Sequence, residues 1–223
     1  MECRWLIEAT GRSSAIARKL GVSRIQDDRL VAVCGFGKPR LGQKVDRTLI
    51  EAVPEGWWYG AVLPQGMVVL VLHTDPRLAR SVRQDWDKAL DRTLFMRKFF
   101  PPEGFDKEPF VVDAGGSRLE SYHGRNWIAC GDSALSFDPL SSQGIYTAMY
   151  SGMSVPKAIS AASRPDESSL DSYALALAGV RRVYRARLAS PYRQIERWPD
   201  SPSWTARQLS ESECPPRDGS QRT

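Results

Sequence analysis

An acidic turn between a short apolar run and a small-residue helical pattern carries the strongest chemical signal in this sequence. Residues Trp127 to Cys130 predict a buried strand that ends at Gly131-Asp132. A Pro-Leu-Ser-Ser-Gln-Gly turn follows, and a helical pattern begins near Gly144. A carboxylate such as that of Asp132 accepts hydrogen bonds from sugar hydroxyls, and the free N–H groups of a helix N-terminus favour an anionic ligand edge. This order of elements predicts a site for a polar cofactor.

A second turn of this kind lies near the start of the sequence. The apolar pair Leu6-Ile7 leads into Ala9-Thr10-Gly11-Arg12, and a helical segment from Ala15 to Leu20 follows. Glycine allows a close approach of the backbone, and the hydroxyls of Thr10 and Ser13 lie near the turn. An Ala-Thr-Gly turn is common by itself, but here it precedes the Gly-Asp turn along the chain.

Together the two turns resemble motifs of FAD-dependent monooxygenases and flavin-dependent halogenases of the aromatic-hydroxylase type. Gly131-Asp132, Asp138-Pro139 and Gly144-Ile145 are similar to the second flavin motif of that superfamily. The resemblance implies that Asp132 contacts the ribityl–pyrophosphate region of FAD and that the Pro-to-Gly turn packs beside the isoalloxazine. The alternative is an ordinary strand–helix turn with a capping Asp. The candidate cofactor-binding residues are Ala9, Thr10, Gly11, Arg12, Gly131, Asp132, Pro139, Ser141, Ser142, Gln143, Gly144 and Ile145.

The Gly-x-Gly-x-x-Gly loop that holds the FAD pyrophosphate in this superfamily has no counterpart here. The nearest string, from Gly35 to Arg40, lacks the third glycine and is interpreted as a loop. We therefore expect an N-terminally truncated flavoprotein, whose FAD binding is weak or absent in this fragment alone. The alternatives are a split gene, a misplaced start codon, or an intact protein with another cofactor. A partner chain carrying the N-terminal Rossmann half would complete a split protein.

An aromatic cluster on a predicted strand supplies candidate substrate contacts. Trp57, Trp58 and Tyr59 are similar to part of the Gly-Trp-x-Trp-x-Ile-Pro segment of halogenases, although Tyr59 replaces the second tryptophan. Alternation along a strand predicts Trp57 and Tyr59 on one face and Trp58 on the other. The alternative is that these rings pack in the core.

Four segments together resemble bacterial flavoproteins that accompany quinone-cofactor amine and amino-acid oxidases. They are 9–14, 51–59, 138–144 and 197–200. This resemblance implies an oxidoreductase or monooxygenase acting on an aromatic substrate, such as a tryptophan of a quinone-cofactor oxidase precursor. It implies NAD(P)H or a flavin reductase as the electron source of the full-length family. The alternatives are a halogenase-like enzyme, a reductase of isoprenoid double bonds, or a non-catalytic remnant that needs a partner chain to bind FAD. His73 and His123 are isolated, so no catalytic residue is assigned.

Composition is typical of a globular protein, with 42% hydrophobic and 26% charged residues among 223 and a net charge of +5. We expect no membrane segment and a cytoplasmic location, because no apolar run is long enough to span a bilayer and no signal peptide precedes Met1. The cysteines (Cys3, Cys34, Cys130 and Cys214) are scattered, so neither a metal site nor a disulfide framework is predicted. Arginines between 181 and 197 spread around a predicted helix, which argues against nucleic-acid binding.

The elements that position these residues predict an α+β fold, an incomplete version of the aromatic-hydroxylase-like fold with an α/β FAD-binding remnant and an antiparallel substrate-domain sheet. The strands are expected at 29–36, 45–53, 57–63, 67–73 and 117–122, and the helices at 76–99, from 144 to a stop or kink at Pro156, and at 170–195. The predicted domains are the end of the Rossmann region (1–28), the substrate domain (29–115), the second FAD-binding segment (116–165), a C-terminal helical segment (166–199) and a flexible tail (200–223).

Overall fold

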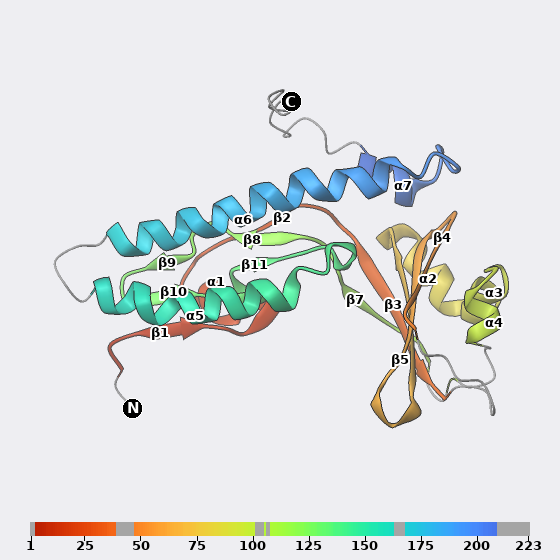
Figure 1. Ribbon diagram of the computed structural model, residues 1–223, viewed down its shortest axis with the longest axis horizontal. Helices are drawn as coiled ribbons and strands as arrows, with labels where there is room; N and C mark the ends of the chain where they lie inside the picture. The colour runs from red at the N-terminus through yellow and green to blue at the C-terminus, as the bar shows by residue number, and fades with distance from the viewer. Residues whose placement is uncertain (1–2, 39–46, 101–104, 106–107, 163–167, 209–223) are drawn as a thin grey trace, which may run out of the picture. The chain divides into compact units, whose positions relative to one another are not determined.

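The computed structural model describes residues 3–38, 47–100, 105, 108–162 and 168–208 of the chain (Figure 1). By its internal contacts the chain divides into two compact units. The first contains residues 1–27, 116–196 and 206–223, and the second contains residues 28–115 and 197–205. Helices and antiparallel sheets are both present, so the predicted α+β class is confirmed.

The first unit holds both predicted flavin motifs on two small sheets. In one sheet, β1 (Leu6–Glu8) pairs in parallel with β10 (Trp127–Ala129), and β10 pairs antiparallel with β9 (His123–Gly124). The other sheet has the order β11-β8-β2 and is antiparallel, with β11 at Leu135–Ser136, β8 at Ser117–Leu119 and β2 at Arg24–Gln26. Because β1 and β10 run parallel, the turns that follow them lie at the same edge of the sheet.

Helices of the first unit begin at or follow these turns. They are η1 (Gly11–Ser13), α1 (Ala15–Lys19), η4 (Gly131–Ser133), η5 (Pro139–Ser141), α5 (Gly144–Ala162) and α6 (Ser168–Arg193). A stop or a kink was expected at Pro156; helix α5 continues beyond this residue, so the expected stop is wrong. Pro156 is exposed, while Val155 and Ala158 on either side of it are buried in the unit's core and hold both halves of the helix. Tertiary packing here outweighs the helix-breaking tendency of proline.

The second unit is built on the predicted antiparallel sheet, whose strand order is β4-β5-β6-β3-β7. The strands are β3 (Val31–Gly37), β4 (Leu49–Val53), β5 (Gly56–Val62), β6 (Val68–Thr74) and β7 (Phe110–Asp113), with η2 (Pro64–Gly66) between β5 and β6. Gly35 and Gly37, interpreted above as part of a loop, belong to β3; residues 39 and 40 lie outside the described part. A Cβ added at Gly35 would lie 2.9 Å from the Trp86 ring, so glycine there lets the ring pack against the strand.

The prediction of a single helix from Pro76 to Phe99 is wrong, because three short helices occupy this range. They are α2 (Pro76–Gln84), α3 (Trp86–Asp91) and α4 (Met96–Phe99). Asp85 leaves helical geometry at φ −111° and ψ 37°. The carboxylate of Glu51 on β4 then accepts the N–H groups of Leu94, Phe95 and Met96 at 2.6–3.0 Å. A carboxylate at that point favours a new helix start.

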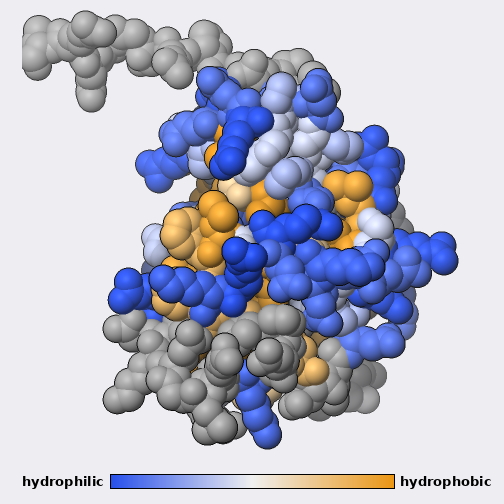
Figure 2. All heavy atoms as spheres, turned by 90° about the vertical axis from the view of Figure 1, so that its right-hand side faces the viewer, coloured by the Kyte–Doolittle hydropathy of each residue, from blue (hydrophilic) through white to orange (hydrophobic). Residues whose placement is uncertain are grey.

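Helices α2 and α3 cover one face of the sheet with an apolar cluster that includes Trp58, Leu72, Val82 and Trp86. On the side of the molecule that carries α3 and α4, apolar residues also reach the surface between hydrophilic ones (Figure 2). Leu94 and Phe95, between α3 and α4, are 65% and 57% exposed.

A flexible tail was predicted from residue 200 onward. This prediction is wrong for the first part of the tail, because Pro202–Gln208 form helix α7. Trp204 is only 3% exposed, and its indole N–H donates to the Val53 carbonyl at 2.9 Å. The Ser203 hydroxyl donates to the Glu55 carbonyl at 2.6 Å. A buried indole with a satisfied N–H stabilises the segment in a way that a Pro- and Ser-rich composition does not indicate. Residues 209–223, Cys214 among them, lie outside the described part.

Within the described residues, no helix combines the length and the apolar character needed to cross a bilayer. The same residues contain no group of three or more His, Cys, Asp or Glu side chains arranged to hold a metal ion. Two arginines of α6 have an acidic partner inside the first unit: Arg181 and Arg185 both lie against Asp27, Arg185 at 3.7 Å. These contacts agree with a structural role for that part of the helix.

Candidate functional site

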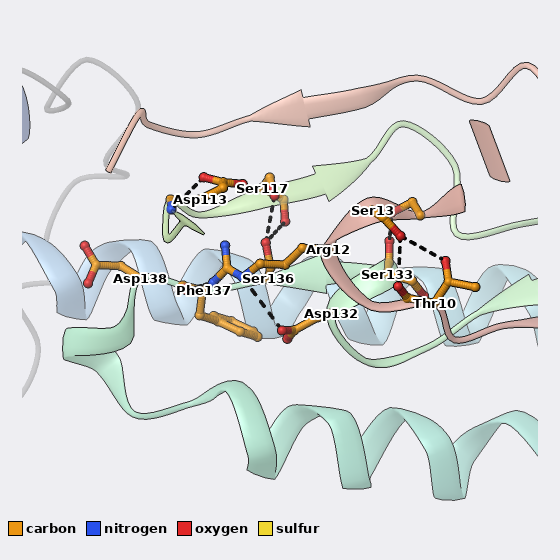
Figure 3. A network of polar contacts seen from close by, with 12 residues as sticks. Thr10, Arg12, Ser13, Asp113, Ser117, Asp132, Ser133, Ser136, Phe137 and Asp138 are labelled. Atoms are coloured by element: carbon orange, nitrogen blue, oxygen red, sulfur yellow. Dashed lines mark hydrogen bonds and ion pairs between the residues drawn. The ribbon is translucent and has the colours of Figure 1, made fainter. Parts of the chain in front are cut away.

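The two motif turns, far apart in the sequence, are in direct contact in the first unit (Figure 3). The Ser133 hydroxyl donates to the Glu8 carbonyl at 2.7 Å, and the Cys130 N–H donates to the same carbonyl at 3.0 Å. In the other direction, the Ser14 hydroxyl donates to the Ser133 carbonyl at 2.9 Å. The Ala-Thr-Gly turn and the Gly-Asp turn therefore form one structural unit.

Glu8 lies within the Ala-Thr-Gly segment, where the sequence assigned it no role, and its side chain holds the first turn together. It is fully buried, and one carboxylate oxygen accepts the N–H and the hydroxyl of Thr10, both at 2.7 Å. The other oxygen accepts the N–H groups of Ile16 and Ala17 at 2.7 and 2.9 Å, which are orphan donors in the first turn of α1. Burial raises the pKa of Glu8, but these hydrogen bonds outweigh burial, and the pKa lies below its ordinary value.

Arg24 on β2 organises the second turn, and no sequence motif indicated it either. Its guanidinium donates to the carbonyls of Asp132 and Ser133, each at 2.9 Å. The same guanidinium donates to the hydroxyls of Ser117 and Ser136 at 2.9 Å, and to that of Ser14. One side chain thus joins β2, β8 and β11 to both motif turns. The planar donor fork of arginine suits such a cluster of oxygen acceptors.

Asp132 lies in the Gly-Asp turn, and its carboxylate is partly exposed to solvent. Arg12 Nε is 3.8 Å from its Oδ2, and the Arg12 guanidinium also donates to the Phe137 carbonyl at 2.7 Å (Figure 3). The Arg12 and Asp132 side chains are 26% and 39% exposed, so a ligand can reach both. A Cβ added at Gly144 would lie 4.0 Å from Asp132 Oδ1, which places the carboxylate beside the start of α5.

The predicted Pro139–Ile145 segment lies between η5 and the first turn of α5. Ser142 adopts left-handed geometry at φ 52°, and Thr147 N–H donates to the Gln143 carbonyl, so the helix begins at Gly144. The first N–H groups of a helix have no partner within it, and Gly144, the first residue of α5, lies beside the Asp132 carboxylate. The structure therefore brings Asp132, Gln143 and Gly144 together.

Two tyrosines of α6 fix the start of this segment. The buried Asp138 accepts the Leu140 N–H at 2.8 Å and the Tyr192 hydroxyl at 2.7 Å, and its own N–H donates to Tyr184 at 2.9 Å. Tyr184 also meets Phe137 edge-to-face with ring centroids 4.8 Å apart. The spacing of eight residues between the tyrosines puts them on one helix face, which is the only sequence signal for this anchor.

Tyr192→Phe is expected to lower the free energy of unfolding by about 1–2 kcal/mol, because one buried carboxylate loses a hydroxyl donor. Urea unfolding followed by tryptophan fluorescence measures the change. Tyr146→Phe is the matched control, because Tyr146 is 70% exposed, and its change should stay within about 0.5 kcal/mol. Equal effects of the two variants would contradict the anchoring role of Tyr192.

Gly131 and Gly11 give the two turns their shape. Their φ angles are +63° and +70°, a region that glycine adopts without the steric cost of a side chain. The Gly131 N–H donates to the Ser151 hydroxyl of α5 at 2.9 Å, which ties the turn to that helix. Burial raises the pKa of the neighbouring Cys130 thiol, and Glu8 raises it further, which favours a structural rather than a reactive thiol at this position.

A groove of about 420 Å³ lies beside this turn, between the start of α5 and α6. Its lining is largely apolar and aromatic, with a few polar groups. It includes Leu140, Gln143, Tyr146, Val180, Tyr184 and Arg187. Its volume falls within the range of small-molecule sites.

The aromatic trio belongs to the second unit, and the predicted alternation holds. Trp58 lies in the core cluster under the helices, with its ring 4.8 Å from that of Trp86. Trp57 lies on the opposite face, stacked on His73 at 3.7 Å, and Tyr59 shares that face and is partly exposed. Core packing is therefore the better explanation for Trp58. Trp57 is also buried, with an exposure of 4%, whereas Tyr59 is partly exposed, and the substrate contact predicted for these two residues stays a prediction.

Comparison with known proteins gives a consistent result. No family model matches the chain. It is 30% identical over 210 residues to LodB of Marinomonas mediterranea, whose name describes an FAD-dependent oxidoreductase; the match covers 92% of this chain and 56% of LodB. The solved flavin-dependent halogenase CmlS is 26% identical with a TM-score of 0.76, over 94% of this chain and 40% of CmlS. The peptidyl tryptophan dihydroxylase QhpG is 19% identical with a TM-score of 0.71, over 93% of this chain and 49% of QhpG, and shares the fold.

The resemblance to FAD-dependent monooxygenases and halogenases is thus confirmed by relatives in both sequence and structure. LodB is named as FAD-dependent and CmlS as flavin-dependent, which supports FAD as the cofactor of the proteins this chain resembles. The chain spans about half the length of the proteins it matches.

Proposed function

We propose that this chain, as a relative of FAD-dependent oxidoreductases, forms the Gly-Asp half of a flavin site in an enzyme that oxidises an aromatic substrate. One observation supports this most strongly. The Ala-Thr-Gly and Gly-Asp turns are joined by direct hydrogen bonds, and the Asp132 carboxylate stays partly exposed beside the start of α5. In an ordinary strand–helix turn, the alternative named above, the Asp carboxylate would cap the helix that follows. Asp132 does not do so, because it lies inside η4, whose N-cap is Cys130.

The residues present fit part of FAD. Asp132 offers a carboxylate to ribityl hydroxyls, and the first N–H groups of α5 favour electron-rich oxygen or nitrogen atoms. A Cβ added at Gly11 would meet no atom within 4 Å, so the backbone of that turn is open to a ligand. When bound, FAD would supply the redox chemistry, while this chain would hold and orient it. Pro139, Ser141, Ser142 and Ile145 would line the same turn, and Ala9, Thr10 and Arg12 the other.

An aromatic ring is the substrate group that this chain suits best. The groove beside the turn is lined by Tyr146 and Tyr184 and by aliphatic side chains, which favour a flat apolar ring. Two reactions are considered: oxidation of a tryptophan in a quinone-cofactor oxidase precursor, in line with the peptidyl tryptophan dihydroxylase QhpG, and halogenation, in line with the flavin-dependent halogenase CmlS. We favour the first because of the sequence resemblance described above.

The remaining parts of the proposal follow from the family. NAD(P)H or a flavin reductase would provide electrons. Retention of FAD by this chain alone would be weak or absent, because no Gly-x-Gly-x-x-Gly loop is present in its sequence. The proposal places the chain in the cytoplasm, where Cys3, Cys34 and Cys130, which are free thiols, would stay reduced.

A flavin titration tests the proposal. The chain is combined with the portion of LodB that it does not cover, and FAD binding is followed by visible absorbance and flavin fluorescence. We expect saturable binding that Asp132→Ala weakens at least tenfold, or about 1.4 kcal/mol. Glu120→Gln, an exposed acidic residue of the same unit, is the control and should leave binding unchanged. Binding that is insensitive to Asp132→Ala would contradict the assigned site.

A further inference from the structure

Another groove lies in the first unit, along a part of helix α6 that the candidate flavin site does not use. Its volume is about 640 Å³, which falls within the range of small-molecule sites. One wall is α6 between Asp171 and Arg181, and the other is the segment from Arg118 to Tyr122, which includes the end of β8. We call this space the α6–β8 groove. It shares no lining residue with the groove beside the Pro139–Ile145 segment.

The middle of the α6–β8 groove is apolar. Ala174, Leu175 and Ala178 recur at helical spacing along the α6 wall, and Leu175 is 72% exposed. The other wall contributes Tyr122, which is 8% exposed and packs in the core of the first unit. The small side chains of the alanines leave room beside an aromatic residue, so this part of the groove suits a planar apolar group.

The charged residues that end the α6 wall have partners of opposite charge. Arg181 lies against Asp27, whose side chain is 4% exposed. Asp171 Oδ1 lies 3.4 Å from His123 Nε2. These two residues therefore close the ends of the wall without adding a strong net charge to the groove.

Arg118 differs from them, because it makes no ion pair within the described part of the chain. It is half-buried, and its guanidinium donates to the Leu119 carbonyl at 3.4 Å. The Tyr122 hydroxyl makes no hydrogen bond with a described residue either. Burial raises the pKa of Tyr122, and Arg118 and Arg181 act against this rise, so both guanidinium groups lie near the hydroxyl. A guanidinium and a hydroxyl with donors still to offer favour an oxyanion.

Glu120 is the carboxylate of the groove that would oppose an anion. It is exposed, whereas Arg118 is half-buried. Water screens an exposed charge more strongly than a half-buried one, so the guanidinium exerts the stronger electrostatic effect inside the groove.

From these contacts we infer that the α6–β8 groove binds a small organic acid, whose carboxylate contacts Arg118 and the Tyr122 hydroxyl. The planar apolar body of the acid lies along the alanines and the leucine of α6. The site uses no residue of the two flavin turns, so its ligand should bind in the absence of FAD.

Binding of phenylacetate to the complete chain tests the inference. Phenylacetamide has the same ring and a neutral amide, so it is the matched ligand, and isothermal titration calorimetry without FAD measures both. We expect the acid to bind about tenfold more tightly than the amide, because a charge-assisted hydrogen bond is stronger than a neutral one. Hexanoate carries a carboxylate without a ring, and inorganic phosphate carries charge without an apolar body. Both should bind more weakly than phenylacetate.

Two pairs of variants locate the site. Arg118→Gln should weaken phenylacetate binding about tenfold, because the charged donor is lost. Arg182→Gln changes an exposed arginine of α6 outside the groove and should leave binding unchanged. Ala178→Trp should fill the groove and abolish binding, whereas Ala186→Trp, at an exposed position of α6 that does not line it, should not. Circular dichroism checks that each variant keeps the wild-type fold.

Four results would overturn the inference. The first is no binding of phenylacetate by the folded chain, and the second is equal affinity for phenylacetate and phenylacetamide. The third is unchanged binding in Ala178→Trp, which would place the ligand elsewhere even where Arg118→Gln does not fold. The fourth is weaker binding in Glu120→Gln, because removal of a carboxylate should not harm an anion site. None of these measurements involves FAD, so each outcome leaves the proposed function to its own test.

Discussion

Replacing Glu8 by alanine is expected to lower the free energy of unfolding by about 3–5 kcal/mol, because buried donors left without an acceptor cost about 1–3 kcal/mol each. The backbone N–H groups of Thr10, Ile16 and Ala17 all lose their acceptor in this variant. The first turn of α1 and the Ala-Thr-Gly turn should loosen together. Urea unfolding at pH 7, read by tryptophan fluorescence, measures the change.

The pH dependence of the same contact has a definite sign. The folded pKa of Glu8 lies below its ordinary value, so the unfolded chain binds the proton more readily. The stabilisation is therefore complete above the ordinary glutamate pKa of 4.5 and is lost as the pH falls through the folded pKa. The difference between wild type and Glu8→Gln should be largest near pH 7 and shrink below about pH 4.

Glu120→Gln provides the control for both Glu8 variants. Glu120 is exposed in the same unit, and its substitution should change stability by no more than about 0.5 kcal/mol. A Glu8→Ala effect as small as that of the control would show that the carboxylate does not hold the turn. An effect of Glu8→Gln that is constant between pH 3 and pH 7 would contradict the lowered pKa.

Arg24→Ala is expected to lower the free energy of unfolding by about 3–4 kcal/mol, since five hydrogen bonds to buried or half-buried oxygens are lost. The Asp132 and Ser133 carbonyls, both in the Gly-Asp turn, lose their guanidinium donor. Arg24→Lys should recover only part of this stability, because an ammonium group cannot reproduce the planar fork. Thermal unfolding by calorimetry measures all three proteins.

The residues that lose protection in Arg24→Ala distinguish the role of Arg24 from that of an ordinary surface arginine. Amide hydrogen exchange should increase in residues 131–136 and around Ser14, where the contacts are lost. Arg18→Ala, an exposed substitution on α1, should leave exchange there unchanged. Full rescue by Arg24→Lys, or unaltered exchange in Arg24→Ala, would contradict the role assigned to the guanidinium.

Much of the second unit could be predicted from sequence because its signals are local. Alternating apolar residues predicted the strands, and the same alternation placed Trp57 and Trp58 on opposite faces of β5. The breaks in the helical region could not be predicted in this way. They depend on Glu51, a residue of a distant strand that caps α4.

Two other predictions were wrong for a related reason: the stop of a helix at Pro156 and the flexibility of residues 202–208. Val155 and Ala158 are buried in the core of the first unit, and Trp204 is buried against β4. Propensity scales count only the residue itself and its sequence neighbours, whereas burial against other segments decides such cases.

By itself the sequence determined the resemblance to flavoproteins, because Gly131-Asp132 and Ala9-Thr10-Gly11 are short segments that can be read from residue types and their order. Only the tertiary structure decided which residues hold those motifs in place. Glu8, Arg24, Tyr184 and Tyr192 act through contacts with residues far away in the chain or on another element. A buried polar side chain gains its role from the partners that folding brings to it, and no local pattern records those partners.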